Sequence, residues 1–446
     1  MRFTVENLGT IQKADLDVGK LTIICGKNNT GKTYFSYALY SHLKFLRNRD
    51  ISNGIINSSQ FYNESEKLKK EGKIVISLQN HVEAYNQRIN DFLKENKSEL
   101  LSLLSFGENR HPQASFNLNF SEAEASEITN SAFTWSEALS STCSLVFEKE
   151  MGSANLNVTK LGIGEENIET AHFSFALAVV VRYFFRKPLP RPFIITCERT
   201  GISMFKTDFL ESWKPKPQSP LKPDSVRPEH YPQAIQKEIE YLVTLHGSDE
   251  KSHIHQSHRE ILNSFSGLLG GDYKFTENNT LKFVTKEAPD GLFLKESSST
   301  VRTLVTLGSY LDKKADTNDL LMIDEPELNL HPANQRKMAR LLAQLVNAGI
   351  RVFLTTHSDY LIKEFNTLLM LKNSNNPRRS ELQTKYGYHD SELLNAEDVK
   401  VYEAVNHGLD AMSVTQAEGI EVKSFDVEII EMGKMQQDIL FGIRRF

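Results

Sequence analysis

The fold is decided by LTIIC, Leu21 to Cys25, followed by GKNNTGKT and then by a stretch of helical character from Tyr34 to Leu46. LTIIC is a continuous apolar run with β-branched residues, which predicts a buried strand. The next eight residues match G-x-x-x-x-G-K-S/T, and a strand before it with a helix after it is the context that this motif requires. The motif consists of Gly26, Lys27, Asn28, Asn29, Thr30, Gly31, Lys32 and Thr33.

This motif predicts a phosphate-binding loop. Glycines let the backbone fold around phosphate oxygens, so that successive N–H groups point inward at the positive end of the following helix. Lys32 is expected to reach the β- and γ-phosphates, and Thr33 is expected to be a ligand of Mg²⁺. The sequence therefore predicts an ATP site with Mg²⁺ at residues 26–33.

Two later apolar strands are predicted to deliver polar groups to the same site. LLMIDE ends in the two acids Asp324 and Glu325. Asp324 is placed to hold Mg²⁺ through water, and Glu325 is placed to polarise the attacking water. VFLTTH ends at His357, 33 residues after Asp324. The interval holds an amphipathic helix, Ala333 to Asn347, so the two strands should be parallel neighbours. His357 should then lie at the same sheet edge as Asp324.

Composition excludes several classes of protein. The 446 residues are 39% hydrophobic and 24% charged, which is too apolar for a disordered chain. No apolar run approaches the roughly 18 residues that cross a bilayer, and MRFTVENLGT has no apolar leader. The net charge of -5 excludes a globally basic nucleic-acid coat. Three widely spaced cysteines favour a reducing, cytoplasmic location over a disulfide framework or a zinc knuckle.

The quoted motifs resemble those of the ATP-binding-cassette class of P-loop ATPases. DEPELNLHP, from Asp324 to Pro332, and TTHSDYL resemble the branch with RecF-like and SMC-like heads and the OLD-family ATPases. ERTGISMF resembles a segment of bacterial anti-phage ATPases in this branch. The resemblance implies that Glu325 is the catalytic base, that His357 is a switch residue touching the γ-phosphate, and that Asn329 belongs to the D-loop.

The class also implies a signature motif that completes the ATP site of a partner protomer. The candidate is the run Ser297, Ser298 and Ser299, although the expected glycine is absent. Serine hydroxyls opening a helix can contact phosphate, and the alternative is an ordinary helix N-cap. A glutamine downstream of the phosphate loop is implied too. Three residues satisfy that position without distinction: Gln60, Gln79 and Gln87.

We predict an α/β fold, a P-loop ATPase head of ABC/SMC-like type with a mainly parallel central sheet. Its N-terminal strands should form an antiparallel edge lobe. The head should consist of residues 1–45 and 285–446, and residues 46–284 should be a large mixed, mostly helical insertion with a proline-rich loop at 215–232. Residues 62–104 are expected to be an exposed helical hairpin. The insertion is too short for a long SMC coiled coil.

The leading functional hypothesis is an ATPase switch that forms a homodimer or higher homo-oligomer and licenses a separate effector, a nuclease or toxin, in anti-phage defence. No nuclease signature appears in the chain, and no membrane partner is expected. The alternatives are a RecF-like repair ATPase that clamps DNA and a scaffold that binds ATP with little hydrolysis.

Two weaker patterns bear on ligands. His253, His255 and His258 would place their rings on different helix faces, which disfavours a metal site. The basic residues Lys372, Arg378 and Arg379 predict either a solvated loop or a nucleic-acid contact.

Overall fold

The computed structural model describes residues 1–49, 58–78, 82–105, 111–121, 132–138, 143–162, 173, 175–177, 179–180, 183–184, 189–205, 231–373, 377–405, 407–421 and 431–440. The proline-rich stretch predicted at 215–232 falls outside these residues, apart from its last two positions.

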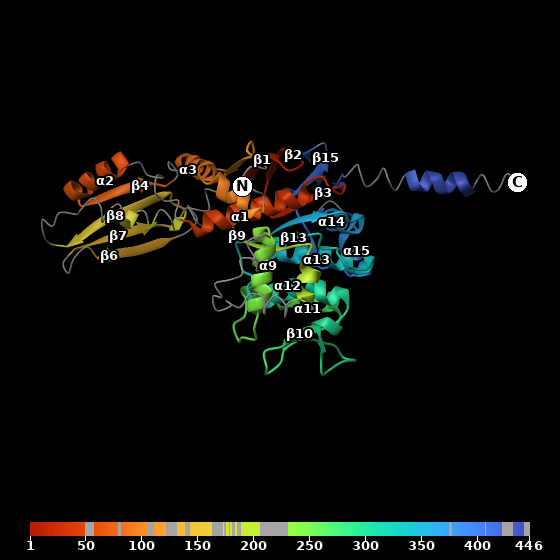
Figure 1. The fold of residues 1–446 in the computed structure, drawn as a ribbon. Coiled ribbons are helices and arrows are strands. Elements are labelled where there is room, and N and C mark those ends of the chain that lie inside the picture. The colour runs from red at the N-terminus through yellow and green to blue at the C-terminus, as the bar shows by residue number, and fades with distance from the viewer. Residues whose placement is uncertain are drawn as a thin grey trace, which may run out of the picture. The chain divides into compact units, whose positions relative to one another are not determined.

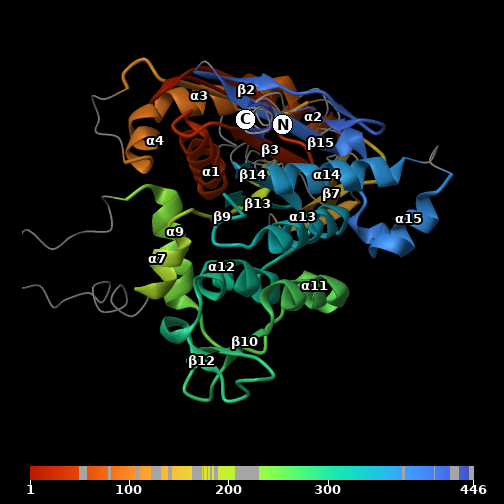
Figure 2. The same cartoon turned by 90° about the vertical axis from the view of Figure 1, so that its right-hand side faces the viewer.

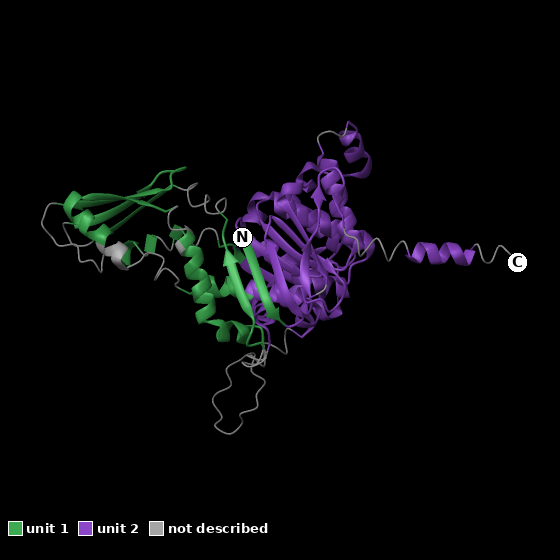
Figure 3. Cartoon of the chain, turned by 90° about the horizontal axis from the view of Figure 1, so that it is seen from above, with its two compact units in different colours: residues 1–8, 41–191 green, residues 9–40, 192–446 purple. Residues whose placement is uncertain are grey.

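The chain divides into two compact units, coloured separately in Figure 3. Unit 1 comprises residues 1–8 and 41–191, and unit 2 comprises residues 9–40 and 192–446. These boundaries differ from the predicted insertion at 46–284, because residues 192–284 group with unit 2. A physical reason is β9, Arg191–Ile195, which joins the central sheet beside the strand that ends in Asp324.

Unit 1 contains a four-stranded antiparallel sheet in the order β4-β8-β7-β6, and β1 pairs with β5, also antiparallel. The predicted helical hairpin at 62–104 is wrong in part, because β4 interrupts the helices. Ile74 and Ile76 are buried while Val75 is exposed, a period-2 pattern that pairs with β8. The elements of unit 1 are β1 Arg2–Leu8, α2 Ser58–Glu71, β4 Lys73–Ser77, α3 Val82–Glu95, α4 Lys97–Leu103, β5 Ser115–Asn119, β6 Phe133–Ala138, β7 Cys143–Lys149 and β8 Asn155–Gly162.

Unit 2 contains the predicted α/β head, with strands in the order β2-β16-β15-β3-β14-β13-β9. The sheet strands are β2 Ile11–Asp17, β3 Leu21–Gly26, β9 Arg191–Ile195, β13 Asp319–Asp324, β14 Arg351–Thr356, β15 Val399–Val405 and β16 Gly408–Ala411. The helices are α1 Lys32–Asn48, which continues into unit 1, α7 Arg199–Met204, α9 Gln233–Thr244, α10 His253–Ser257, α11 Arg259–Leu269, α12 Ser299–Lys313, α13 Pro332–Asn347, α14 Asp359–Lys372 and α15 Arg379–Tyr386. Smaller strands are β10 Asp272–Phe275, β11 Leu281–Val284, β12 Leu292–Phe293, β17 Val414–Thr415 and β18 Gly419–Ile420.

The central strands β15, β3, β14 and β13 are parallel to one another. Strands β3, β13 and β14 are buried on both faces, which explains the apolar runs in their sequences. Apolar residues of one face pack with α12, α13 and α14 in a single core. Figures 1 and 2 both show α11 and α12 between this sheet and β10, which belongs to the small β10-β11-β12 sheet.

The strand register brings the predicted polar groups to one edge. Asp324 lies opposite Thr355, and Thr356 lies opposite Cys25. The carboxyl ends of β13, β14 and β3 therefore lie next to one another. This edge carries Glu325, His357 and Gly26, each at the end of its strand or one residue beyond it. The prediction that His357 shares a sheet edge with Asp324 is confirmed.

Candidate nucleotide site

The phosphate loop adopts backbone conformations that two of its glycines make possible. Gly26 has a φ of 132° and Gly31 has a φ of 91°. Residues with a side chain rarely adopt such positive φ angles, because the Cβ atom would clash with the backbone. A Cβ at Gly26 would lie 2.8 Å from the carbonyl oxygen of Ala404, and one at Gly31 would lie 2.8 Å from Ile11 Cγ1. The loop is thus packed against β15 and the start of β2, and it leads directly into α1.

Lys32 is buried and lies across the loop. Its Nζ donates to the carbonyl oxygens of Lys27 at 2.6 Å and Gly26 at 3.1 Å. Burial lowers the pKa of Lys32, whereas the charges of Glu325 and Asp324 oppose that change. Nucleotide phosphates would offer the ammonium group anionic acceptors that are stronger than these two carbonyls.

Thr33 and Asp324 lie together, as the sequence predicts for Mg²⁺ ligands. Thr33 Oγ1 donates to Asp324 Oδ2 at 3.1 Å, and the hydroxyl of Thr355 donates to Asp324 Oδ1. Burial raises the pKa of Asp324, and the charges of Glu325 and Glu198 add to the rise. A buried carboxylate beside a hydroxyl is the hard oxygen donor set that suits Mg²⁺, so these residues fit that cation.

Glu325 and His357 face each other across the same edge. His357 Nε2 lies 3.5 Å from Glu325 Oε1, and both side chains are partly exposed. Burial and the charge of Lys32 lower the pKa of His357, which favours the neutral imidazole. The backbone of Glu325 has a φ of 51°, in the left-handed region, and its N–H donates to the Thr355 carbonyl oxygen at 3.1 Å. An acid held in such a strained conformation is a feature that clusters at functional sites.

Sequence reasoning missed Glu327 as part of this site. The side chain is mostly buried, and its Oε1 accepts from the backbone N–H of His357 at 2.7 Å and from Thr356 Oγ1 at 2.8 Å. Burial raises the pKa of Glu327. The available signal was a second acid two residues after Glu325, within DEPELNLHP, to which the sequence analysis gave no separate role.

A tyrosine and a further acid also adjoin the site. Tyr37 on α1 donates its hydroxyl to Glu198 Oε2 at 2.9 Å, just beyond the end of β9. Arg199 follows, buried beneath the end of β13. Glu198 and Arg199 are the first two residues of ERTGISMF. The sequence analysis noted the resemblance of this segment to related ATPases but gave none of its residues a role.

Asn329, which the sequence resemblance places in a D-loop, joins three elements of unit 2. Its φ is 59°, and its side-chain amide donates to Thr303 Oγ1 at 3.0 Å and to Thr200 Oγ1 at 3.2 Å. The hydroxyl of Thr300 donates to the Asn329 carbonyl at 2.8 Å. Asn329 therefore links the segment after β13 with α7 and α12.

The three candidate signature serines open α12. Ser298 is the N-cap, with its Oγ accepting from the Val301 N–H at 3.3 Å, and Ser299 is the first helical residue. Ser297 is buried, and its hydroxyl donates to the Phe293 carbonyl at 2.9 Å. The N-cap reading thus describes Ser298 within one chain, and a contact with a partner's nucleotide stays a prediction. Of the candidate glutamines, Gln87 donates to Asp91, Gln60 lies in α2, and Gln79 lies outside the described residues.

The histidine cluster does not converge. His255 approaches Asp312, with Nδ1 2.7 Å from Oδ1, whereas His258 approaches Glu260 at 3.1 Å. Within the described ranges, no group of three or more His, Cys, Asp and Glu residues could hold a metal ion.

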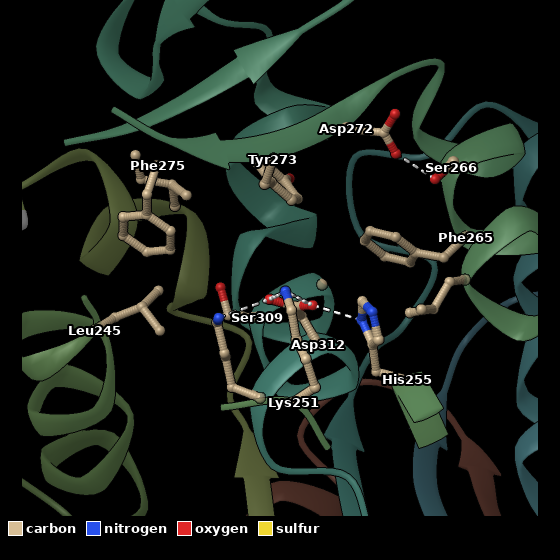
Figure 4. Close-up of a pocket in the computed structure, with 14 residues that line it drawn as sticks. Leu245, Lys251, His255, Phe265, Ser266, Asp272, Tyr273, Phe275, Ser309 and Asp312 are labelled. Atoms are coloured by element: carbon tan, nitrogen blue, oxygen red, sulfur yellow. Dashed lines mark hydrogen bonds and ion pairs between the residues drawn. The ribbon is translucent and has the colours of Figure 1, made fainter. Parts of the chain in front are cut away.

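His255 instead lines a pocket of about 240 Å³ beside α12, whose lining includes none of the predicted nucleotide-site residues (Figure 4). In Figure 4, Lys251 and His255 both point to Asp312, and Phe265, Tyr273 and Phe275 form part of the wall. Asp312 accepts from Lys251 Nζ at 2.8 and 3.1 Å. Lys251, His255 and Lys313 are thus paired with Asp312, and Asp272 accepts from the Ser266 hydroxyl, so we assign no ligand to this pocket.

Two of the three basic residues that the sequence analysis placed in a loop, Arg378 and Arg379, form ion pairs. Arg378 Nη2 lies 2.7 Å from Glu381 Oε1, and Arg379 Nη2 lies 2.6 Å from Asp390 Oδ1. Lys372 is the last residue of α14. In the part of the chain that the structure describes, no helix is long and apolar enough to cross a membrane.

Comparison with known proteins gives one family match and several solved structures. The model of the AAA ATPase domain matches residues 215–362, about a third of the chain, which includes Asp324, Glu325 and His357. No curated protein matches the chain.

Three similar structures are SMC heads, each 10% identical to this chain. One is an SMC head bound to the C-winged helix domain of ScpA, covering 93% of this chain and 97% of that chain with a TM-score of 0.35. The head from Thermotoga maritima covers 93% and 98% with a TM-score of 0.29. The head from Pyrococcus furiosus, with an extended coiled coil and the C-terminal domain of ScpA, covers 97% and 98% with a TM-score of 0.33.

Three observations agree with one another: the phosphate loop, the strand order of unit 2 and the family match all indicate a P-loop ATPase. The chain has the α/β fold of a P-loop ATPase head, and it contains a segment that matches an AAA ATPase domain.

Proposed function

We propose that this chain binds ATP with Mg²⁺ and hydrolyses it between two head-to-tail protomers, with Glu325 as the general base. The observation that supports this most is the convergence at one sheet edge of Lys32, Asp324, Glu325 and His357. Lysine and Mg²⁺ would neutralise the phosphates, and a carboxylate beside them would take the proton of the attacking water.

Residues of this chain supply most of the chemistry in that scheme. Thr33 and Asp324 would hold Mg²⁺, which neutralises charge on the phosphates when bound. Lys32 would leave the loop carbonyls for the β- and γ-phosphates. The neutral His357, 3.5 Å from Glu325, would donate to the γ-phosphate or orient the base. Ser298 and Ser299 of the partner would close the site.

Glu325→Gln tests this proposal. The amide keeps the shape of the side chain but cannot take the proton, so turnover should fall by at least about 100-fold while ATP binding survives. Light scattering with Mg²⁺-ATP should then show more dimer than the wild-type protein forms. A variant that hydrolyses ATP at the wild-type rate would exclude Glu325 as the base.

We further propose that the ATP-bound dimer licenses a separate effector in the cytoplasm, in bacterial anti-phage defence. This role is supported by the motif resemblance and by the lack of a recognised nuclease signature in the sequence. Co-purification with the product of the neighbouring gene, with and without ATP, tests it. An effector whose activity does not depend on the nucleotide state of this chain would contradict it.

A further inference from the structure

Arg199 makes an unusual set of contacts under the catalytic edge of unit 2. The residue is 2% exposed. Its Nη1 donates to the carbonyl oxygen of Asp324 at 2.7 Å, and its Nη2 donates to the carbonyl oxygen of Glu325 at 2.6 Å. One guanidinium group therefore holds the backbone of both acids that follow the apolar part of β13.

Such a pair of contacts depends on the conformation of Glu325. In an extended strand, successive residues alternate in direction, so adjacent carbonyls do not point to one group. Here the left-handed φ of 51° at Glu325 turns the chain, and both carbonyls face Arg199. The left-handed conformation is unfavourable for a residue with a side chain, so other contacts must stabilise it.

The other polar group of the Glu325 backbone is held as well. Its N–H donates to Thr355 O at 3.1 Å and approaches Thr355 Oγ1 at 3.2 Å. The peptide group before Glu325 is thus bound both to β14 and to Arg199, and the peptide group after it is bound to Arg199. From this backbone the Glu325 side chain extends toward His357, with Oε1 3.5 Å from Nε2.

Arg199 is itself fixed by a buried polar network. Its Nη1 also donates to the Thr196 carbonyl at 2.8 Å, at the end of β9. Glu238 on α9 accepts from the Thr196 N–H and hydroxyl, each at 2.7 Å, and from Thr306 on α12 at 2.8 Å. Burial lowers the pKa of Arg199, and the charge of Glu238 opposes that change.

We infer that Arg199 is a positioning residue for the ATPase reaction: its guanidinium fork holds the turned backbone at Glu325 and so aims the catalytic carboxylate. Lysine cannot replace it, because an ammonium group is a point donor and lacks the planar fork that reaches two carbonyls. This inference rests on the proposed function of Glu325. Displacing a catalytic group by about 1 Å can reduce turnover by about 100-fold.

Steady-state ATP hydrolysis by Arg199→Lys tests the inference, together with affinity for a fluorescent ATP analogue and thermal unfolding. We expect kcat to fall by about 100-fold, whereas affinity changes less than about threefold, because residues 26–33 are untouched. Arg340→Lys is the matched control. Arg340, on α13, pairs with the buried Glu364 of α14 at 2.6 Å. Its substitution should leave kcat unchanged.

A double-mutant cycle with Glu325→Gln separates positioning from general damage. If Arg199 acts through Glu325, adding Arg199→Lys to Glu325→Gln should cause no further loss of turnover. A further 100-fold loss, or a parallel loss of nucleotide affinity, would overturn the inference.

Arg199→Gln, which buries no charge, covers the case in which the lysine variant fails to fold. The same loss of kcat is expected for it, and a folded glutamine variant with wild-type kcat would overturn the inference. If neither variant folds, the role of Arg199 is structural and the inference also fails. A wild-type protein without turnover would instead overturn the proposed function and this inference with it.

Discussion

Substituting Ser298 with aspartate and with alanine separates a helix cap from a signature motif. Ser298 Oγ accepts from the Val301 N–H at 3.3 Å at the start of α12. Aspartate caps a helix about as well as serine, whereas alanine offers no acceptor. A partner's γ-phosphate, however, would be repelled by the aspartate carboxylate. The aspartate variant should therefore be the more stable of the two, whereas the alanine variant should have the faster turnover if Ser298 contacts the phosphate.

The size of each effect follows from the geometry. Because the cap hydrogen bond is long, Ser298→Ala should cost toward the low side of the usual range, about 1 kcal/mol or less. In a unit of this size that lowers Tm by about 2 °C, and Ser298→Asp should leave Tm nearly unchanged. If Ser298 serves the partner's γ-phosphate, the aspartate variant should lose at least about 100-fold in kcat, as when an oxyanion donor is removed.

Phosphate release and thermal melts on both variants are the assays, with ATP binding measured on dilute protein. A decisive mixture combines Ser298→Asp with Lys32→Ala protein. Each is expected to be inactive alone, but a mixed dimer has one site with an intact Lys32 facing an intact Ser298. Partial recovery on mixing supports the shared site. Wild-type turnover by Ser298→Asp would mean that the serine only caps α12, and loss of ATP binding by its monomer would mean that it acts within its own chain.

Two further predictions concern the phosphate loop and the core. Lys32→Ala should abolish measurable binding of a fluorescent ATP analogue, because the β,γ-phosphates lose their main cation, and unchanged affinity would exclude the phosphate-loop assignment. Glu364→Ala should lower the free energy of unfolding by about 2–3 kcal/mol in denaturant titration, since it leaves Arg336 and Arg340, both 2.6 Å from its carboxylate, without their buried partner. ATP affinity should not change, and an unchanged midpoint would contradict a stabilising role for this cluster.

The central strands and their polar ends could be predicted from the sequence, because each is a local signal. LTIIC, LLMID and VFLTT are short apolar runs that end in residues of a known phosphate-binding or acidic pattern. The single helix between Asp324 and His357 fixed β13 and β14 as parallel neighbours, and the structure has that register. Local pattern and connection length were sufficient for this part of the fold.

The remaining parts of the site depend on contacts between distant residues, which a single sequence does not reveal. β9 reads as a buried strand, but its place beside β13 follows only from the complete sheet order. Arg199 lies 125 positions before Asp324, and its hydrogen bonds go to backbone carbonyls, for which no side-chain type is required. The strand β4 was missed because its apolar residues lie among charged residues that also suit a helix.

Backbone contacts explain how the candidate catalytic side chains can be both partly exposed and well placed. The Glu325 N–H is bound by Thr355, its carbonyl by Arg199, and the His357 N–H by Glu327. Three strand ends are thereby fixed to one another without using the carboxylate of Glu325 or the ring of His357. Both groups can then face a nucleotide with little reorganisation, which is the arrangement that makes electrostatic catalysis effective. The proposed scheme also requires a donor for the far side of the γ-phosphate. A second protomer is the source that we propose, and for that reason the mixed-dimer experiment with Ser298 and Lys32 tests the assembly as directly as it tests a residue.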